Sequence, residues 1–226
     1  MKKRFSAELA YLSGIVLLAL GTAFMERADF GMSMVVAPAY ILHLKLSRSF
    51  AWFSFGMSEY LLQGVLILVI SFIMRRFKKG YLFSFITAVV YGLILDGCIA
   101  LVSPLPLGGI AGRCVWYVLG FLVCALAVAL IFHTYIAPEA YELFVRELVE
   151  KTGADTGRVK TIYDCTSCII GILLSFACFG FGHFEGVKLG TVLCALVNGW
   201  TIGKVSGFLE KKLEFFDALP LRRYFE

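Results

Sequence analysis

Six long apolar stretches constrain the fold of this chain more than any other feature of its sequence. They cover residues 7–25, 54–74, 81–102, 114–132, 161–181 and 187–208. A helix needs about 20 mostly apolar residues to cross the roughly 30 Å hydrocarbon layer of a bilayer, and each stretch has about that length. The sequence therefore predicts an all-α, polytopic membrane protein with about six transmembrane helices.

The composition supports the same class. Hydrophobic residues make up 60% of the 226 positions and charged residues only 16%, whereas about 25% of the residues of a soluble domain are charged. The net charge of +5 does not indicate a nucleic-acid partner, because Lys and Arg form short clusters between the apolar stretches. We expect a single membrane domain over residues 1–226, in contact with the lipid bilayer and ending in a cytoplasmic tail at 209–226.

The basic clusters also predict an orientation. They lie at residues 2–4, 75–79, 146–160 and 211–223, so they precede the first stretch and follow every second one. The positive-inside rule then puts both termini in the cytoplasm, which agrees with an even number of spans. Cleavage of a signal peptide after Ala23 is the disfavoured alternative, since the first apolar run is nearly long enough to span.

Two longer connections indicate an internal repeat. Each contains an Ala-Pro pair, Ala37-Pro38 or Ala137-Pro138, and proline is favoured in the first turn of a helix. We therefore expect short helices near 36–46 and 137–151, the first dipping into the bilayer and the second, which is amphipathic, lying on the membrane surface. Repeat units over 7–102 and 114–208 would each hold three spans. The second unit must then cross in the opposite sense, which predicts a 3+3 inverted repeat of the kind common among secondary transporters.

Short glycine-containing motifs occupy residues 21–31, 157–164 and 190–199, the first ending in Arg27-Ala28-Asp29-Phe30-Gly31. These segments resemble the YczE/YyaS/YitT family of bacterial membrane proteins, and the similarity extends over most of the chain. The resemblance implies a multi-pass protein of the bacterial cytoplasmic (inner) membrane. The family is largely uncharacterised, with transport a suspected activity. Where family members often have a proline soon after the Asp-x-Gly motif, this chain delays it to Pro38.

Charged side chains near the ends of the apolar stretches are candidate gates. An ionisable residue inside a span costs roughly 2.5–3.5 kcal/mol on insertion scales, so each needs a reason. Alternating access requires a closure at each end of a central cavity. The candidates for ion-paired gates are Arg27, Asp29, Asp96 and Arg113 near the outer surface, and Arg158, Asp164 and Lys204 near the inner surface. Snorkelling to the headgroups explains Lys204 and Arg113 equally well, and Asp164 is also placed to cap a helix.

Polar residues between these two levels are the candidates for binding a solute. They are Glu59, Gln63, Tyr91, Ser167 and Asn198. Glu59 and Gln63 are four residues apart and share a helix face, and Glu59, Asp96 or Asp164 would be suited to couple transport to protons. The alternative is that each polar residue forms a hydrogen bond between helices, worth about 0.6 kcal/mol on average.

Glycines and cysteines are expected to serve packing. Gly199, Gly203 and Gly207 recur every four residues, which allows a close helix approach within the chain or in a dimer, and we expect packing within the chain. Most of the seven cysteines lie in apolar stretches and are expected to be buried. Cys165 and Cys168 form a C-x-x-C pair, which is the spacing of a redox or metal site and the only basis for reading the chain as an intramembrane enzyme. No further cysteine pair or histidine cluster accompanies it, so this alternative is disfavoured. With no nucleotide-binding or catalytic motif, we expect no enzyme activity, no cofactor and no metal.

Together these features predict a secondary transporter or permease that moves a small-molecule solute by alternating access. The alternative is a membrane subunit for binding or assembly that does not transport, such as a substrate-capture component or a scaffold. Because six helices make a small bundle, the sequence is also compatible with a homodimer.

Overall fold

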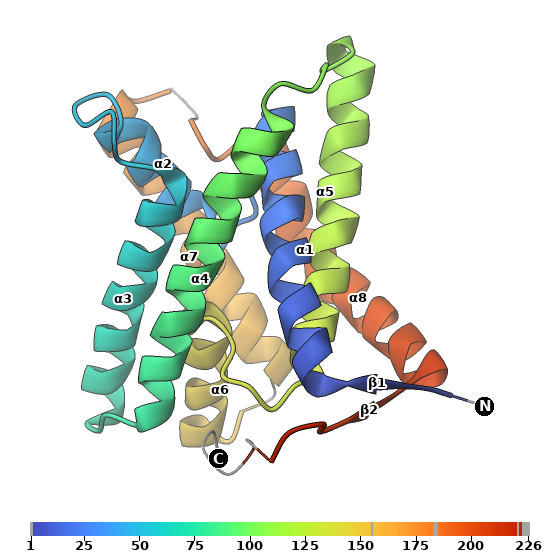
Figure 1. The fold of residues 1–226 in the computed structure, drawn as a ribbon. Helices are drawn as coiled ribbons and strands as arrows, with labels where there is room; N and C mark the ends of the chain where they lie inside the picture. The colour runs from blue at the N-terminus through green and yellow to red at the C-terminus, as the bar shows by residue number, and fades with distance from the viewer. Residues whose placement is uncertain (1, 155, 183–184, 221, 223–226) are drawn as a thin grey trace.

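The computed structural model describes residues 2–154, 156–182, 185–220 and 222, and its elements are α-helical apart from two short strands (Figure 1). The long helices are α1 (Ala7–Ala28), α3 (Phe55–Met74), α4 (Lys79–Val102), α5 (Gly109–Phe132), α7 (Thr156–Phe179) and α8 (Leu189–Lys212). The short elements are α2 (Ala37–Leu46), α6 (Ala140–Thr152), β1 (Lys3–Ser6) and β2 (Leu213–Phe216). Among the described residues, six helices are long and apolar enough to cross a membrane, which confirms the predicted class and the predicted number of candidate spans.

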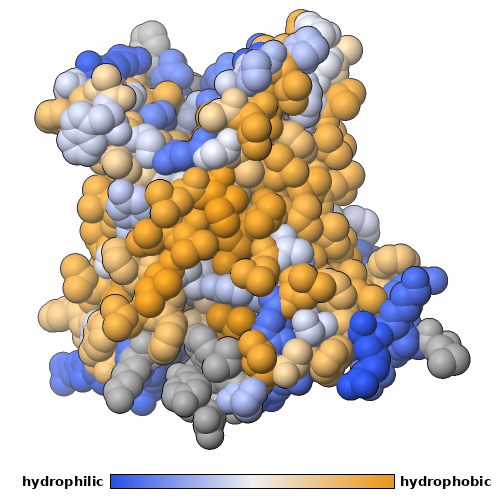
Figure 2. Space-filling model, viewed as in Figure 1, coloured by the Kyte–Doolittle hydropathy of each residue, from blue (hydrophilic) through white to orange (hydrophobic). Residues whose placement is uncertain are grey.

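The outside of the bundle is apolar, as a lipid-facing surface requires. Phe72, Leu101, Ile110 and Leu196 are 73–85% exposed although they lie within spanning helices. Figure 2 shows a hydrophobic belt across the middle of the molecule, with hydrophilic residues at both ends. A water-soluble protein does not expose apolar surface on this scale. The chain is therefore a multi-pass membrane protein.

Helices α1 and α5 pack most closely together, α4 packs on α1, and α8 packs on α5. The crossing of α1 and α5 depends on Gly21 and Gly120. A Cβ atom added at Gly21 would lie 2.8 Å from the carbonyl oxygen of Gly120, and one added at Gly120 would lie 2.7 Å from the carbonyl oxygen of Gly21. Because the two backbones touch, neither position has room for a side chain.

The short helices α2 and α6 begin inside the bundle and extend towards opposite ends of it (Figure 1). Helix α2 packs on α3 and α7, and α6 also packs on α3 and α7. The expectation that residues 137–151 lie on the membrane surface is wrong. Tyr141, Leu143 and Val145 on its apolar face are buried by protein, and so are the acidic Glu139 and Glu147.

Both termini lie at one end of the bundle, which we call the terminal face. There β1 and β2 pair in parallel, from Lys3 opposite Leu213 to Ser6 opposite Phe216. The tail was expected to begin at residue 209, but helix α8 continues to Lys212, and the next residues form β2, which pairs with β1. The other end of the bundle, where α3, α5 and α8 begin, is the opposite face.

Two packing expectations do not hold in the described part of the chain. A Cβ atom added at Gly199, Gly203 or Gly207 would meet nothing within 4 Å, so this glycine row does not pack against another helix of the chain. Helix α8 instead contacts its neighbours through residues such as Ile202 and Leu209. All seven cysteines are free, but Cys114 and Cys165 are exposed and not buried.

Candidate functional site

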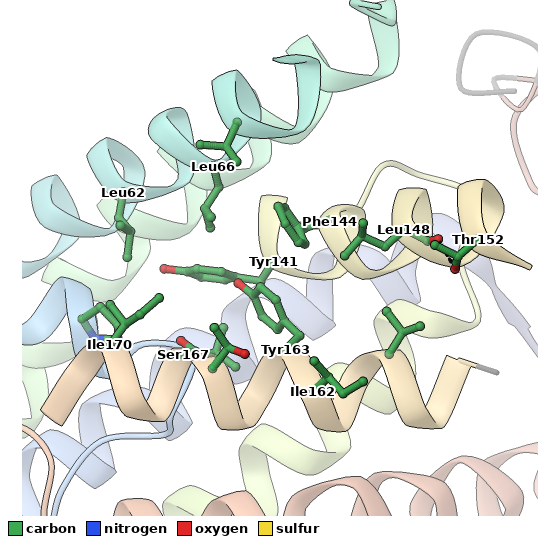
Figure 3. A pocket seen from close by; sticks show the side chains of 15 residues that line it. Leu62, Leu66, Tyr141, Phe144, Leu148, Thr152, Ile162, Tyr163, Ser167 and Ile170 are labelled. Carbon is green, nitrogen blue, oxygen red and sulfur yellow. Dashed lines mark hydrogen bonds between the residues drawn. The ribbon is translucent and has the colours of Figure 1, made fainter. Parts of the chain in front are cut away.

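A cavity of about 550 Å³ lies between α3, α6 and α7, and the first residues of α2 reach its edge (Figure 3). Its wall is mainly apolar and includes Leu62, Leu66, Phe144, Leu148 and Ile170. Hydroxyl groups reach it from Tyr141, Tyr163 and Ser167, among others. Sites for small molecules are usually apolar cavities of about 300–1,000 Å³ with a few polar groups. This cavity has the size and the lining of a solute site.

A buried acidic network lies directly behind the ring of Tyr141. The Tyr141 hydroxyl donates a 2.9 Å hydrogen bond to Oε2 of Glu59. The amide nitrogen of Gln63 lies 3.5 Å from the same oxygen and donates at 3.2 Å to Oε2 of Glu139. Glu59 and Gln63 are fully buried and Glu139 is 5% exposed. Two carboxyl groups therefore share one amide donor, with Tyr141 between them and the cavity.

Gln63 and two hydroxyl side chains of α4 hold the start of α6 inside the bundle. The backbone N–H of Ala140 donates to Oε1 of Gln63 at 3.0 Å. The Ser84 hydroxyl donates to the carbonyl oxygen of Pro138 at 2.6 Å, and Thr87 donates to that of Ala137 at 3.2 Å. Backbone polar groups at membrane depth must be satisfied by protein, because no bulk water reaches them. Helices α3 and α4 supply these partners, which explains how a helix can begin there.

One oxygen of each carboxyl group remains without a partner. Oε1 of Glu59 and Oε1 of Glu139 are buried and accept no hydrogen bond from the described residues. Burial raises the pKa of Glu139 well above its ordinary value, and the charges of Glu142 and Glu59 raise it further. An unpaired buried carboxylate is strongly unfavourable, so it takes up a proton or binds a cation. The network is thus suited to hold one or the other.

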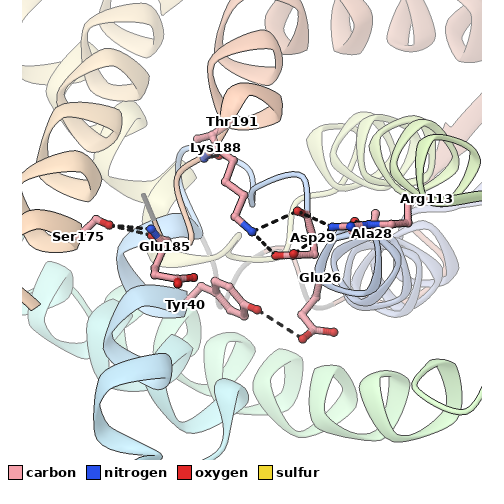
Figure 4. Close-up of polar contacts among 9 residues, drawn as sticks. All are labelled: Glu26, Ala28, Asp29, Tyr40, Arg113, Ser175, Glu185, Lys188 and Thr191. Carbon is pink, nitrogen blue, oxygen red and sulfur yellow. Dashed lines mark hydrogen bonds and ion pairs between the residues drawn. The ribbon is translucent and has the colours of Figure 1, made fainter. Parts of the chain in front are cut away.

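At the opposite face, Asp29 joins three helices through two ion pairs (Figure 4). Its carboxylate contacts Nη2 of Arg113 at 2.9 Å and also the ammonium group of Lys188. Arg113 donates in addition to the carbonyl oxygen of Ala28 at 2.7 Å. Gly31 has a φ of +101°, and a Cβ atom there would lie 2.8 Å from the backbone nitrogen of Lys188. The Ala-Asp-Phe-Gly turn therefore fits only with glycine at this position. We call Asp29, Arg113 and Lys188 the opposite-face cluster.

Nearer the terminal face, Lys160 joins α6 to α7. Its ammonium group lies 3.4 Å from Oε1 of Glu142 and 3.3 Å from Oδ1 of Asp164. All three side chains are at most 18% exposed, so these pairs are less screened by solvent than those of Asp29. We call Lys160, Glu142 and Asp164 the terminal-face cluster.

Some predicted gate residues form these clusters and others do not. Asp29 and Arg113 are brought together as an ion pair, and Asp164 pairs with Lys160, while the side chain of Arg158 lies outside the described residues. Asp96 is no partner in either cluster: it accepts from the Ser54 hydroxyl and from the backbone N–H of Gly56 at the start of α3. Arg27 donates to the carbonyl oxygen of Leu105 at 2.7 Å, and Lys204 is exposed, 5.7 Å from the Trp200 ring.

The predicted solute-binding residues are divided in the same way. Glu59 and Gln63 form the acidic network, and Ser167 lines the cavity while donating to the carbonyl oxygen of Met34 at 2.9 Å. Tyr91 is buried but donates to Thr22, at the contact of α4 with α1. Asn198 is half-buried on α8, outside the residues that line the cavity.

Sequence reasoning missed Glu139, Tyr141, Lys160 and Lys188. Glu139 and Tyr141 were assigned to a surface helix, where a glutamate needs no explanation. A signal was present, because Ala137-Pro138-Glu139 matches Ala37-Pro38-Ala39 of the other short helix. The matching segment was expected to enter the bilayer, and a charged residue in place of its alanine would need a special role there.

Comparison with known proteins gives a family match over most of the chain. The model of a family described as "Family of unknown function (DUF6198)" matches residues 5–207. No curated protein and no solved structure matches the chain.

Proposed function

We propose that this chain, which belongs to the family of unknown function DUF6198, is a secondary transporter that carries a small solute across a membrane. Membership supports a membrane-helical protein of an uncharacterised family. The finer assignments remain our proposals: the likeness to the YczE/YyaS/YitT proteins, the bacterial inner membrane, and cytoplasmic termini. The homodimer also stays a prediction.

The observation that carries this proposal is a ligand-sized cavity beside a buried acidic network, with one ion-paired cluster alongside the cavity and another at the opposite face. The cluster that contains Asp29 lies at the opposite face, and the cluster that contains Lys160 lies on α6 and α7 beside the cavity, among the residues that line it. In alternating access, a solute site opens to one side of the membrane at a time, and contacts at the other end keep it closed. Breakable ion pairs beside the cavity and at the opposite face suit that cycle.

The packing of the helices supports the inverted repeat. If α1–α4 are exchanged with α5–α8, the contact of α4 with α1 becomes that of α8 with α5. The contact of α2 with α7 becomes that of α6 with α3. Helices α1 and α5 exchange with each other, and so do their facing glycines Gly21 and Gly120. We infer a two-fold relation about an axis between α1 and α5, as in transporters built from inverted repeats.

The proposal is tested by labelling one cavity residue from each side of the membrane. In a variant with its seven native cysteines replaced by alanine, Leu62→Cys places a thiol in the cavity wall. An impermeant maleimide should label it from both sides of sealed vesicles. Leu68→Cys is the control, because Leu68 is on the same helix but 68% exposed on the apolar exterior, and it should react from neither side.

Variants of the two clusters sharpen the test. Asp29→Asn should increase labelling of the Leu62→Cys thiol from the outer side, and Lys160→Gln should increase it from the cytoplasmic side. Labelling from one side only, unchanged by both variants, would exclude alternating access and favour a subunit that binds without transporting.

A further inference from the structure

The buried carboxyl groups of Glu59 and Glu139 are not neutralised by any basic residue described in their surroundings. Their recorded hydrogen-bond partners are Gln63 and Tyr141, and each group has one oxygen left over. Two ionised carboxylates around one amide would repel each other strongly in a medium of low dielectric constant. The network therefore needs at least one positive charge.

The titratable groups that face the pair come from every helix around it. They are Tyr11 of α1, Tyr91 of α4, Cys124 of α5, Tyr141 and Glu142 of α6, and Tyr163 of α7. All are neutral or acidic. Lys160 of α7 is already paired with Glu142 and Asp164. The missing charge must come from a proton or from a ligand.

The adjoining cavity indicates what kind of ligand fits. Leu62, Leu66 and Phe144 give it an apolar wall, and the rings of Tyr141 and Tyr163 also line it (Figure 3). The Tyr141 hydroxyl is bonded to Glu59. Aromatic faces attract cations as well as apolar groups. This apolar and aromatic lining suits an organic cation, whose body can fill the cavity.

We propose that the solute is an organic cation with an apolar body, and that it exchanges with one proton held between Glu59 and Glu139. The apolar body fills the cavity, and the positive charge reaches the carboxyl groups when the Tyr141 side chain moves aside. One cation enters for each proton that leaves, so the charge of the network stays constant. The exchange across the membrane rests on the proposed transport function. The binding of a cation at this site does not depend on transport.

The probe for the test is tetraphenylphosphonium, an apolar cation with no proton of its own. Its binding to the purified full-length protein is measured by calorimetry between pH 5.5 and 8.5, in two buffers of different ionisation enthalpy. We expect about one proton released per cation bound, and affinity falling up to tenfold for each unit of pH below the range in which the pair titrates. Tetraphenylborate, an anion of matched shape, should not bind.

Variants identify the groups responsible. Glu59→Gln and Glu139→Gln should each lower the affinity for tetraphenylphosphonium at least tenfold at pH 8. Glu150→Gln is the matched control, because Glu150 is an exposed glutamate of α6 that pairs with Lys78 at the surface, and it should leave the affinity unchanged. If a variant elutes as an aggregate, the proposal is judged from the unmodified protein alone, by the number of protons released per cation bound and by the pH dependence of the affinity.

Equal binding of the cation and the anion, no proton release, or full affinity in both variants would each overturn the assignment. A second measurement separates the proposed transport function from the proposed cation site. It is the uptake of the probe into liposomes with an acidic interior, compared with uptake into protein-free liposomes. Proton-linked binding without uptake would refute transport and retain the site. Cavity labelling from both sides without cation binding would retain the transporter and refute this choice of solute.

Discussion

Gln63 provides the most direct test of how the inside of the bundle is held together. Its amide accepts from the N–H of Ala140 at 3.0 Å and donates towards Glu139 at 3.2 Å and Glu59 at 3.5 Å. Replacing it by leucine gives an apolar side chain of similar size and removes all three contacts. The N–H of Ala140 then has no acceptor at the start of α6.

The expected loss of stability follows from these contacts. An unsatisfied buried N–H costs about 1–3 kcal/mol, and the two longer bonds add about 0.6 kcal/mol each at the average found between membrane helices. Gln63→Leu should therefore lower the free energy of unfolding by about 2–4 kcal/mol. For a chain of this size each kcal/mol lowers the melting temperature by roughly 2–4 °C, so a drop of about 5–15 °C is expected. Thermal unfolding of the purified protein in detergent measures it.

Ser71→Ala on the same helix is the control. The Ser71 hydroxyl donates only to the carbonyl oxygen of Ile67, one turn earlier, so its loss should change stability by less than about 0.5 kcal/mol. If Gln63→Leu were no more destabilising than Ser71→Ala, the view that Gln63 anchors α6 would be refuted.

Three further predictions concern other parts of the fold. Gly120→Val should prevent α1 and α5 from packing and abolish recovery of monodisperse protein on size exclusion, whereas Gly203→Val, at a position that meets nothing within 4 Å, should be recovered normally. Because burial raises the pKa of Glu139, its contribution to stability is fully present below the ordinary glutamate pKa of about 4.3 and is lost as the pH rises through the raised value. Glu139→Gln should flatten this pH dependence in denaturation measurements, and an unchanged slope would count against a buried, protonated Glu139. Asp29→Asn should cost no more than about 1 kcal/mol in the same assay, since the Asp29 side chain is 55% exposed, and the difference should shrink in high salt.

Much of the architecture was predictable because it depends on local properties of the chain. An apolar run of about 20 residues forms a spanning helix in any bilayer protein, whatever it packs against. The helix ends agree with local chemistry as well: the Ser6 and Ser54 hydroxyls accept from the N–H groups of Leu9 and Met57 at the starts of α1 and α3. The two short helices follow from their Ala-Pro starts in the same way.

The candidate site was only partly predictable, because it depends on contacts between distant segments. Glu59 and Gln63 were identified since polar residues in an apolar helix are costly, but their partners Glu139 and Tyr141 come from a helix that was assigned to the membrane surface. An amphipathic pattern shows that one face is polar without showing what that face meets. Asp96 illustrates the same limit, since an acid near a helix end suits a gate or a cap, and the structure makes it a cap at the start of α3.

The amino-acid sequence by itself thus determined six membrane spans, two short helices and the acidic character of α3, since hydrophobic length and turn chemistry act within a few residues. The tertiary structure alone decided that α6 enters the bundle, that Gln63 links two carboxyl groups, and that the Gly199–Gly203–Gly207 row faces away from the other helices of the chain. These features depend on which helix faces meet. That choice is made by packing over the whole chain, and periodicity along one helix does not contain it.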